Sequence, residues 1–248
     1  MKGHYYNDIA KDYHLKRKAP WKPLENFLIH LSQKNFTFKG FCIDLGCANG
    51  RNFKPFKKRT NKLIGIDHSL EFLKITLKTL KEFNQYSKRD SDNIQLILGD
   101  LNYIPIRLNS IQTIFSIATI HHIKGKTKRE KAIFQIFSLL SETGYFLPTV
   151  WRKWQKKFRK YFIFDGFKRF LNPFYKKHQK LVGLNEFGDK YIPWTLSKEN
   201  IIYNRFYHFF SKREIKNLLK PFKIQEFWIT GGPDNKDNFF ILCKKLYH

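Results

Sequence analysis

The sequence is poor in cysteine and in acidic residues, and it has no long apolar run. Its 248 residues include three cysteines, Cys42, Cys47 and Cys243, and no C-x-x-C spacing. An odd number of cysteines without that spacing favours neither a disulfide framework nor a cysteine zinc site, and it indicates a reducing compartment. No apolar run approaches the roughly 18 residues of a membrane-spanning helix, and the polar N-terminal residues lack the apolar segment of a secretion signal. We therefore expect a soluble cytoplasmic protein without integral membrane association.

Acidic residues are far outnumbered by basic ones. The chain has 20 Asp and Glu against 47 Lys and Arg, which gives a formal net charge of +27 at neutral pH. A field of this sign raises the local concentration of polyanions, so nucleic acid is the first partner to consider. Only 11 of the basic residues are Arg, and an excess of Lys beside Asn, Ile and Phe is also typical of proteins from low-GC genomes. The charge therefore favours an anionic partner without identifying it.

Strand-like and helix-like segments alternate from about residue 39 onward. The apolar runs typical of strands are FCIDLG, KLIGID, IQLILGD, TIFSIATI and GYFLPTV. Helical spacing characterises SLEFLKITLKTLKEF and TKREKAIFQIFSLLSETG, and we expect Gly144 to end the second helix. This alternation predicts a mostly parallel sheet with helices on both faces, and FKIQEFWIT with DNFFILCKKL predicts a closing antiparallel pair. Residues 151–204 interrupt the pattern, and we interpret them as an insertion within a single domain spanning residues 1–248.

The stretch FCIDLGCANGRNF combines a strand with a glycine turn. Ligands bind at the carboxyl ends of strands in open α/β sheets, and Gly46 and Gly50 tolerate the positive φ angles that a tight turn under a ligand requires. Asp67 follows Asp44 by 23 residues and ends the next strand, where an acid can accept hydrogen bonds from both ribose hydroxyls of a nucleoside.

The acid before the turn distinguishes between nucleotide cofactors. Asp44 is poorly suited to a pyrophosphate but well suited to the ammonium group of an amino acid. The pattern therefore favours S-adenosylmethionine (SAM) over NAD, and a third strand that ends at Gly99 and Asp100 supports this interpretation.

These residues resemble the motifs of class I SAM-dependent methyltransferases. The resemblance implies a Rossmann-like α/β domain with a mostly parallel seven-stranded sheet, an antiparallel last strand and helices on both faces. It implies SAM as the cofactor and gives each residue a contact: Asp44, Gly46 and Gly50 line the methionine part, Asp67 holds the ribose, and Asp100 with the Leu101 backbone meets the adenine. The chain departs from the family at Ala48, where glycine is usual, so a methyl group narrows the turn.

A narrower resemblance covers nearly the whole chain. The segments that carry it are YNDIAKDYHLKRKAPW, SIATIHHI, VW at Val150 and Trp151, GDKYIPW and NRFYHFFSKREI. They look like the tRNA wobble-uridine carboxymethyl methyltransferases, which are related to the methyltransferase half of AlkB-like tRNA modifiers. The resemblance implies esterification of the carboxylate of 5-carboxymethyluridine at position 34 of the anticodon loop. It also implies a small zinc-binding activator subunit as the partner in a heterodimer.

The same resemblance nominates residues for the reaction. It places Arg17, His121 and Asp189 at the mouth of the active site and Trp151, Arg205, Tyr207 and His208 around the uridine. A carboxylate with a pKa near about 4 is a nucleophile at neutral pH, so the reaction needs orientation and a cation but no general base. His121 and His122 are neighbours, so on a strand they would point to opposite sides and would not share a metal ion. We expect no metal site, and Asp189 has no charged sequence neighbour other than Lys190.

The insertion begins with a basic, aromatic segment. Residues 151–181 hold eleven basic side chains against the single acid Asp165. On a helix, Trp151, Trp154, Phe158 and Tyr161 would share one face, which we expect to pack on the domain while the basic face grips an anticodon arm. A helix at a membrane surface would show the same pattern. Two other functions remain open: a methyltransferase of a small or lipid-like acid at a membrane surface, and a non-catalytic RNA-binding protein.

Overall fold

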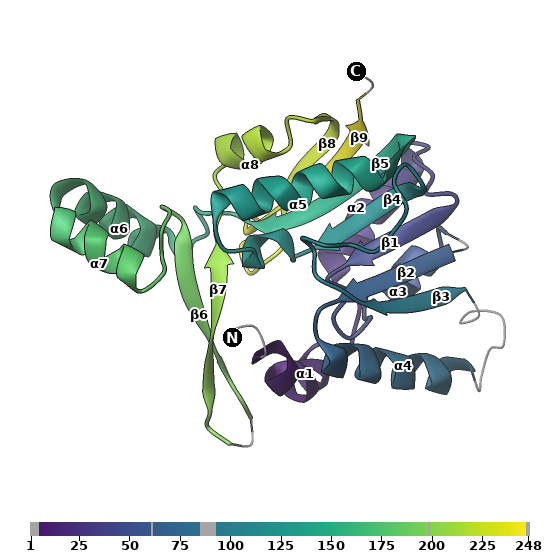
Figure 1. Ribbon diagram of the computed structural model, residues 1–248, viewed down its shortest axis with the longest axis horizontal. Coiled ribbons are helices and arrows are strands. Elements are labelled where there is room, and N and C mark those ends of the chain that lie inside the picture. Colours follow the sequence, from purple (N-terminus) through teal and green to yellow (C-terminus); the bar gives the residue numbers. More distant parts are fainter. Residues whose placement is uncertain (1–4, 61, 85–92, 198, 247–248) are drawn as a thin grey trace.

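The centre of the molecule is a sheet of seven strands in the order β3-β2-β1-β4-β5-β9-β8 (Figure 1). The computed structural model describes residues 5–60, 62–84, 93–197 and 199–246. The strands are β1 (Phe41–Leu45), β2 (Lys62–Asp67), β3 (Ile94–Leu98), β4 (Ile111–Ile117), β5 (Leu140–Trp151), β8 (Phe222–Thr230) and β9 (Asn238–Lys245). Strands β1 to β5 pair in parallel, and β9 runs antiparallel to both of its neighbours. The predicted sheet and its closing antiparallel pair are confirmed.

The central strands are apolar along their length because both of their faces are covered. Strands β1, β2 and β4 are buried at nearly every position after the first, which is typical of a parallel sheet between two helical layers. Neighbouring residues Cys42 and Ile43 of β1 belong to separate core clusters, as alternation of side chains along a strand requires. The sheet therefore separates two cores, one on each face.

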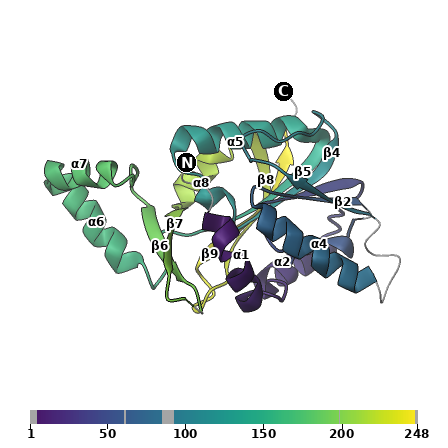
Figure 2. The ribbon, with the colours of Figure 1, turned by 60° about the horizontal axis from the view of Figure 1, so that its bottom comes forward.

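Helices cover the two faces in separate groups (Figure 2). Helices α5 (Lys126–Leu139) and α8 (Lys212–Leu218) contribute to one core cluster. Helices α2 (Lys22–Gln33), α3 (Phe53–Lys57) and α4 (Leu70–Asn84) contribute to the other. Helix α1 (Tyr5–Lys16) packs along α4. None of the helices in the described part of the chain is long and apolar enough to cross a bilayer.

Two predicted boundaries in the central part of the chain are wrong. Helix α5 ends at Leu139, before Gly144, and β5 runs through that glycine. The side chain of Leu140 is fully buried and the residue pairs with Ile111 of β4, so strand pairing outweighs the stop signal of the glycine. His121 lies in a short 3₁₀ turn, η1 (Ile120–His122), because β4 ends at Ile117 and Ala118 turns the chain with a φ of 54°.

The insertion forms two hairpins that project from the sheet (Figures 1 and 2). The first is the helix pair α6 (Arg159–Leu171) and α7 (Pro173–Leu181), and the second is the antiparallel pair β6 (Asp189–Thr195) and β7 (Ile202–His208). The expected helix from Trp151 is wrong, because Trp151 ends β5 and α6 begins only at Arg159. Trp151 and Phe158 instead pack into a small cluster with Tyr207 and Phe209.

Candidate active site

A cavity of about 1250 Å³ lies where β1, β2, β3 and β4 end. The turn after β1 contributes Gly46 and Ala48, and the tips of the next two strands contribute Asp67 and Asp100. The predicted convergence of these strand ends on one hollow is therefore what the structure shows. Segments from α1, η1, β5, β6 and β7 complete the wall, so the insertion forms one side of the same cavity.

The floor of the cavity is the turn from Gly46 to Gly50. Gly46, Ala48 and Gly50 have φ angles of 74°, 48° and 68°, a region that alanine adopts at a cost. A Cβ atom on Gly46 would collide with the Thr119 side chain, so glycine keeps the backbone open at this point. Gly50 shapes the turn from outside the cavity lining.

Two side chains hold Ala48 in its left-handed conformation. Asp67 Oδ2 accepts a hydrogen bond from Ala48 N at 2.8 Å, and Thr76 Oγ1 donates one to the Ala48 carbonyl at 2.9 Å. The same Asp67 accepts a second bond from Ser69 N at 2.9 Å. The departure from glycine at position 48 is thus accommodated by fixed backbone contacts, and Asp67 joins β2 to the turn.

Asp44 is a buried carboxylate without a partner. Its side chain is 1% exposed, and neither of its oxygens makes a hydrogen bond among the described residues. Burial and the nearby charge of Asp67 raise the pKa of Asp44 to about 8. It does not line the cavity itself, yet it stands two residues before Gly46. An isolated acid in this position suits an ammonium group, so the residues present fit the amino-acid end of SAM.

Polar groups at the end of β3 complete the nucleoside side of the cavity. Asp100 and Leu101 both line it, as predicted. Asp100 Oδ1 accepts hydrogen bonds from Asn102 N at 2.7 Å and from Asn102 Nδ2 at 2.8 Å. These bonds fix the turn that follows the strand, so the backbone of Leu101 has a set position.

The opposite wall presents hydrogen-bond donors that have no acceptor. The backbone N–H of Trp151 donates to His121 Nδ1 at 3.2 Å, so the neutral ring carries its hydrogen on Nε2. Among the residues that the structure describes, that buried Nε2 has no hydrogen-bond partner, and neither have Tyr6 Oη and Arg205 Nε. Burial and the neighbouring His122 keep the pKa of His121 well below its ordinary value, so the ring is neutral.

The three donors belong to one aromatic cluster. The His121 ring lies 5.0 Å from the Tyr207 ring, and the Tyr6 ring lies 5.6 Å from that of His122, which in turn is 4.3 Å from Tyr207. The Arg205 guanidinium sits 4.6 Å from the Trp194 ring and 5.2 Å from the Tyr207 ring. Stacked rings hold this cation in place, and its Nε has no hydrogen-bond partner among the described residues.

Arg17 and Trp151 also line the cavity, as predicted. Arg17 follows α1, and its carbonyl accepts a hydrogen bond from Asn49 Nδ2 at 2.9 Å. Asn7 of the same helix accepts one from Ser69 Oγ at 2.7 Å. Helix α1 is therefore tied to the cofactor turn and to the start of α4, and it closes the cavity on that side.

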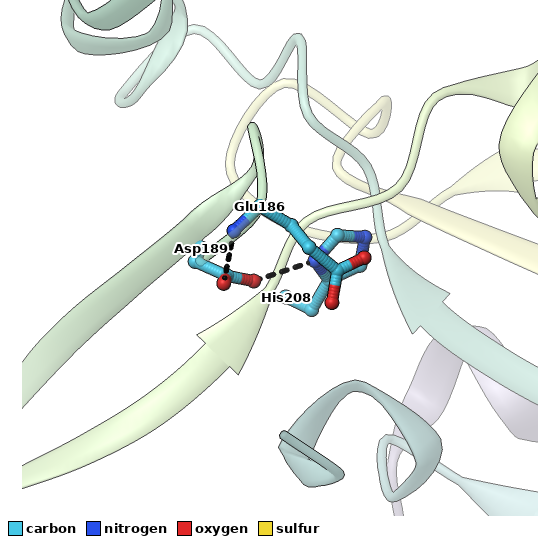
Figure 3. A group of neighbouring side chains, drawn as sticks. All are labelled: Glu186, Asp189 and His208. Carbon is cyan, nitrogen blue, oxygen red and sulfur yellow. Dashed lines mark hydrogen bonds and ion pairs between the residues drawn. The ribbon is translucent and has the colours of Figure 1, made fainter. Parts of the chain in front are cut away.

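Two nominated residues, Asp189 and His208, do not line the cavity. They are directly opposite each other in the β6–β7 register, and His208 Nδ1 lies 2.7 Å from Asp189 Oδ1 (Figure 3). His208 Nε2 lies 2.9 Å from Glu214 Oε1 at the start of α8. The sequence gives Asp189 no charged neighbour other than Lys190, whereas strand pairing brings it a histidine from 19 residues further along the chain. Both side chains are buried, and their contact joins β6 to β7.

Glu186 joins this pair, and the three residues bring ligand-type atoms within 4.8 Å of one another. The polar atoms of the group are largely engaged: Asp189 Oδ2 accepts from Glu186 N at 2.8 Å, and Glu186 Oε2 pairs with Arg129. Both nitrogens of His208 face carboxylates. The arrangement is an ion-pair network that fastens β6 and β7 to α5 and α8.

Tyr6, Trp194 and Asn204 are cavity residues that the sequence analysis did not select. Tyr6 and Trp194 lie inside quoted motifs, YNDIA and GDKYIPW. A tyrosine on a helix near the N-terminus, here Tyr6 beside Tyr5, has no distinctive spacing. The burial of its hydroxyl follows only from the packing of α1 against η1 and β7.

Comparisons with known proteins agree with this site. Residues 43–147 match the family model described as a methyltransferase domain. The chain is 26% identical over 263 residues to a tRNA (carboxymethyluridine(34)-5-O)-methyltransferase of Schizosaccharomyces pombe, covering 97% of this chain and 94% of the relative. A SAM-dependent methyltransferase from Methanosarcina mazei superimposes with a TM-score of 0.68 at 17% identity, covering 88% of this chain and 98% of the other.

A further solved structure was determined with a product of the cofactor. The 1,6-didemethyltoxoflavin-N1-methyltransferase of Burkholderia thailandensis holds S-adenosylhomocysteine, and it superimposes with a TM-score of 0.60 at 12% identity over 98% of this chain and 88% of the other. These structural likenesses confirm the predicted fold.

Proposed function

We propose that this chain is a class I SAM-dependent methyltransferase that esterifies the carboxylate of 5-carboxymethyluridine at the wobble position 34 of tRNA. The proposal rests on the wall of unpaired donors formed by Tyr6, His121 and Arg205. A carboxylate offers two acceptor oxygens. Buried donors without an acceptor disfavour a ligand that has no acceptor atoms to offer them. The S. pombe relative, named for this reaction and aligned over 97% of the chain, adds support from outside the geometry.

The reaction requires orientation more than proton transfer. A substrate carboxylate is ionised at neutral pH, and His121 is neutral and presents an N–H. Donors on one carboxylate oxygen leave the second oxygen free to attack. The wall composed of Tyr6, His121 and Arg205 therefore binds and aims the nucleophile, and it does not need to remove a proton.

The cofactor side of the cavity matches the donor. The turn from Gly46 to Gly50 with Asp44 would hold the amino-acid end of SAM, Asp67 the ribose, and Asp100 with the Leu101 backbone the adenine. When bound, SAM supplies an electrophilic methyl group on a sulfonium. A cavity of about 1250 Å³ exceeds the usual ligand pocket of roughly 300–1,000 Å³, which leaves room for a base beside the cofactor.

A nucleic-acid substrate agrees with the charge and with the aromatic wall. The net charge of +27 favours a polyanion, and Trp194 and Tyr207 offer rings near the donors where an unstacked base can lie. We also propose the small zinc-binding activator as a partner. Strands β3 and β8 form the two edges of the seven-stranded sheet, and strand pairing at an edge is a common way to dock a subunit.

The decisive test is nucleoside mass spectrometry of tRNA from cells that lack the gene. We expect 5-carboxymethyluridine to accumulate and its methyl ester to disappear, and the wild-type gene should restore the ester. Persistence of the ester without accumulation of the acid would refute the assignment. Calorimetry with SAM provides the companion test, since no binding at millimolar concentration would contradict every enzymatic interpretation.

A further inference from the structure

Helix α6 has an unusual distribution of polar and apolar side chains. Its inward face carries Asp165, 2% exposed, whose Oδ2 accepts from Arg169 Nε at 2.7 Å and whose Oδ1 accepts from Tyr175 Oη at 2.9 Å. Arg169 also donates to the Leu184 carbonyl at 3.1 Å. A buried ion pair with these bonds fixes the rotation of α6, because turning the helix would leave Asp165 without its partners.

The outward face of the same helix is apolar. Phe164 and Phe167 are each 63% exposed, Phe170 is 86% exposed and Leu171 is 71% exposed. These positions and Ile163 fall within about a third of a turn of one another at 3.6 residues per turn, so they form one stripe. The stripe continues across the connection into α7, where Phe174 and Leu181 are 84% and 77% exposed. Helix α7 buries none of its residues.

Basic side chains accompany the apolar ones. Lys160 precedes Ile163 by three residues and Phe164 by four, and Lys177 lies three residues after Phe174 and four before Leu181, so each shares the exposed face. Lys168, Lys176 and Lys180 are also exposed. The single acid of α6 and α7, Asp165, is buried in its ion pair. The outer surface of the α6–α7 hairpin is thus apolar and cationic at once.

We infer that the outer face of the α6–α7 hairpin docks on an anionic lipid bilayer. Aromatic and aliphatic side chains enter the boundary between headgroups and acyl chains, while lysines extend toward lipid phosphates. The hairpin stands away from the sheet in both views (Figures 1 and 2), and a bilayer demands no matching shape from a projecting surface. This attachment is peripheral and independent of the proposed reaction.

Other occupants fit the surface less well. A second copy of the hairpin would bring two cationic faces together, which like-charge repulsion opposes. RNA would satisfy the lysines and could stack on phenylalanine rings, but it offers nothing to cover Ile163, Leu171 and Leu181. The sequence predicts that the aromatic side chains of this segment pack on the domain while the basic face grips RNA, whereas α6 carries most of its aromatic rings outward.

The test is flotation of the full-length protein with vesicles of phosphatidylcholine alone or mixed with phosphatidylserine. We expect binding to the mixed vesicles only. Phe170→Ser/Phe174→Ser should reduce that binding at least tenfold, because both side chains are exposed and contribute to the stripe. The matched control is Phe134→Ser on α5, where a ring that is 69% exposed lies outside the hairpin, and it should bind as the wild type does.

A second pair of variants tests the cationic part. Lys176→Glu/Lys177→Glu should weaken vesicle binding more than Lys54→Glu/Lys58→Glu, which changes the net charge equally at exposed positions of α3 and its C-terminus. Failure of the wild type to bind the mixed vesicles would overturn the inference, as would equal binding by the Phe170→Ser/Phe174→Ser and Phe134→Ser variants. A tenfold loss of tRNA affinity in Phe170→Ser/Phe174→Ser with unchanged vesicle binding would assign the surface to RNA instead.

Discussion

The donors in the cavity wall illustrate how single residues acquire a role from distant parts of the chain. Tyr6, His121 and Arg205 come from α1, η1 and β7, and each leaves one buried polar atom without a partner. Burial of an unpaired donor costs about 1–3 kcal/mol, so a ligand that accepts all of these bonds offsets that cost. A carboxylate meets that requirement.

Replacing Tyr6 with phenylalanine removes only the hydroxyl. We expect Tyr6→Phe to lower kcat/KM for the carboxylate substrate about tenfold, equivalent to about 1.4 kcal/mol, while SAM affinity stays unchanged. Tyr175→Phe is the control, since its hydroxyl bonds Asp165 in the α6–α7 hairpin, outside the cavity lining. Asp67→Ala should instead abolish SAM binding, and with it methylation, because Asp67 also holds Ala48 and Ser69.

Steady-state methylation and calorimetry measure these two quantities. A loss of SAM affinity in Tyr6→Phe equal to that in Asp67→Ala would contradict the division between a substrate wall and a cofactor floor. Unchanged kcat/KM in Tyr6→Phe would remove this hydroxyl from the substrate wall.

Local motifs predicted which strand ends meet at the cavity, where Gly46, Asp67 and Asp100 lie, whereas Asp44 and Gly50 stand outside its lining. Asp44, Gly46 and Asp67 belong to short segments in which strand, turn and acid follow one another, so their positions depend little on the rest of the chain. The substrate wall depends instead on how α1 and the β6–β7 hairpin meet the sheet. No spacing in the sequence indicates that Tyr6 lies near His122 or that Asp189 faces His208.

At the scale of elements, the pairing of β6 with β7 explains the misplaced residues. The register sets Asp189 against His208 and leaves Arg205 and Tyr207 in the cavity wall. Glu214, which caps α8 together with Ser211, then contacts the far nitrogen of His208. A strand pair, a histidine and a helix start therefore stabilise one another, and the hairpin gains a fixed orientation toward the sheet.

This network makes stability depend on pH through His208. Burial lowers the pKa of His208, but the hydrogen bonds to Asp189 and Glu214 outweigh burial, and the net pKa is raised. A raised pKa in the folded state means that the imidazolium contributes its full stability below the unfolded pKa of about 6.5 and loses it as pH rises through the folded pKa. The folded state should therefore lose stability as the pH increases above about 6.5.

We expect His208→Gln to lower the free energy of unfolding by about 3 kcal/mol near pH 6, because it leaves Asp189 without a cation and Glu214 with Lys153 alone. The difference from wild type should shrink as the pH rises past the folded pKa of His208. Thermal unfolding across this range measures both effects, and a decrease of roughly 6–12 °C in Tm is the expected scale near pH 6. A difference that does not vary with pH would show that His208 acts through packing alone.

The insertion shows where helical periodicity misleads. Trp151, Trp154, Phe158 and Tyr161 have helical spacing, yet the chain from Trp151 to Phe158 leaves the sheet without forming a helix. The backbone of Arg152 pairs with the Asp237 carbonyl and that of Lys153 with the Phe210 carbonyl. Tertiary hydrogen bonds to segments about 60 to 85 residues away determine this path. The spacing of residues in the sequence cannot predict such bonds.

At the scale of the whole molecule, the excess of positive charge predicts that the binding of tRNA and the binding of SAM depend differently on salt. Binding of tRNA releases counterions from phosphates, whereas SAM binding depends on short-range contacts in a cavity. For a protein that contacts six to ten phosphates, affinity falls about 10³- to 10⁵-fold between roughly 50 and 200 mM salt. We expect the affinity for tRNA to decrease by a factor within this range between these salt concentrations, and the affinity for SAM to change little.

Filter binding for tRNA and calorimetry for SAM at several salt concentrations provide the comparison. A logarithmic plot of the tRNA binding constant against salt gives the number of phosphates neutralised, with a slope near −0.9 per phosphate on duplex and near −0.7 on single strands. A slope near zero for tRNA would mean that the net charge of +27 does not act in binding this partner.

The order of the strands has a consequence for how the polypeptide matures. Strand β8 precedes β9 in the chain but reaches the sheet only through it, since β9 lies between β5 and β8. A ribosome therefore synthesises residues 222–230 before the strand to which they bond. Until residues 238–245 are added, β5 and β8 each have an unpaired strand edge. Nascent chains stalled in that interval should be the form most readily captured by chaperones.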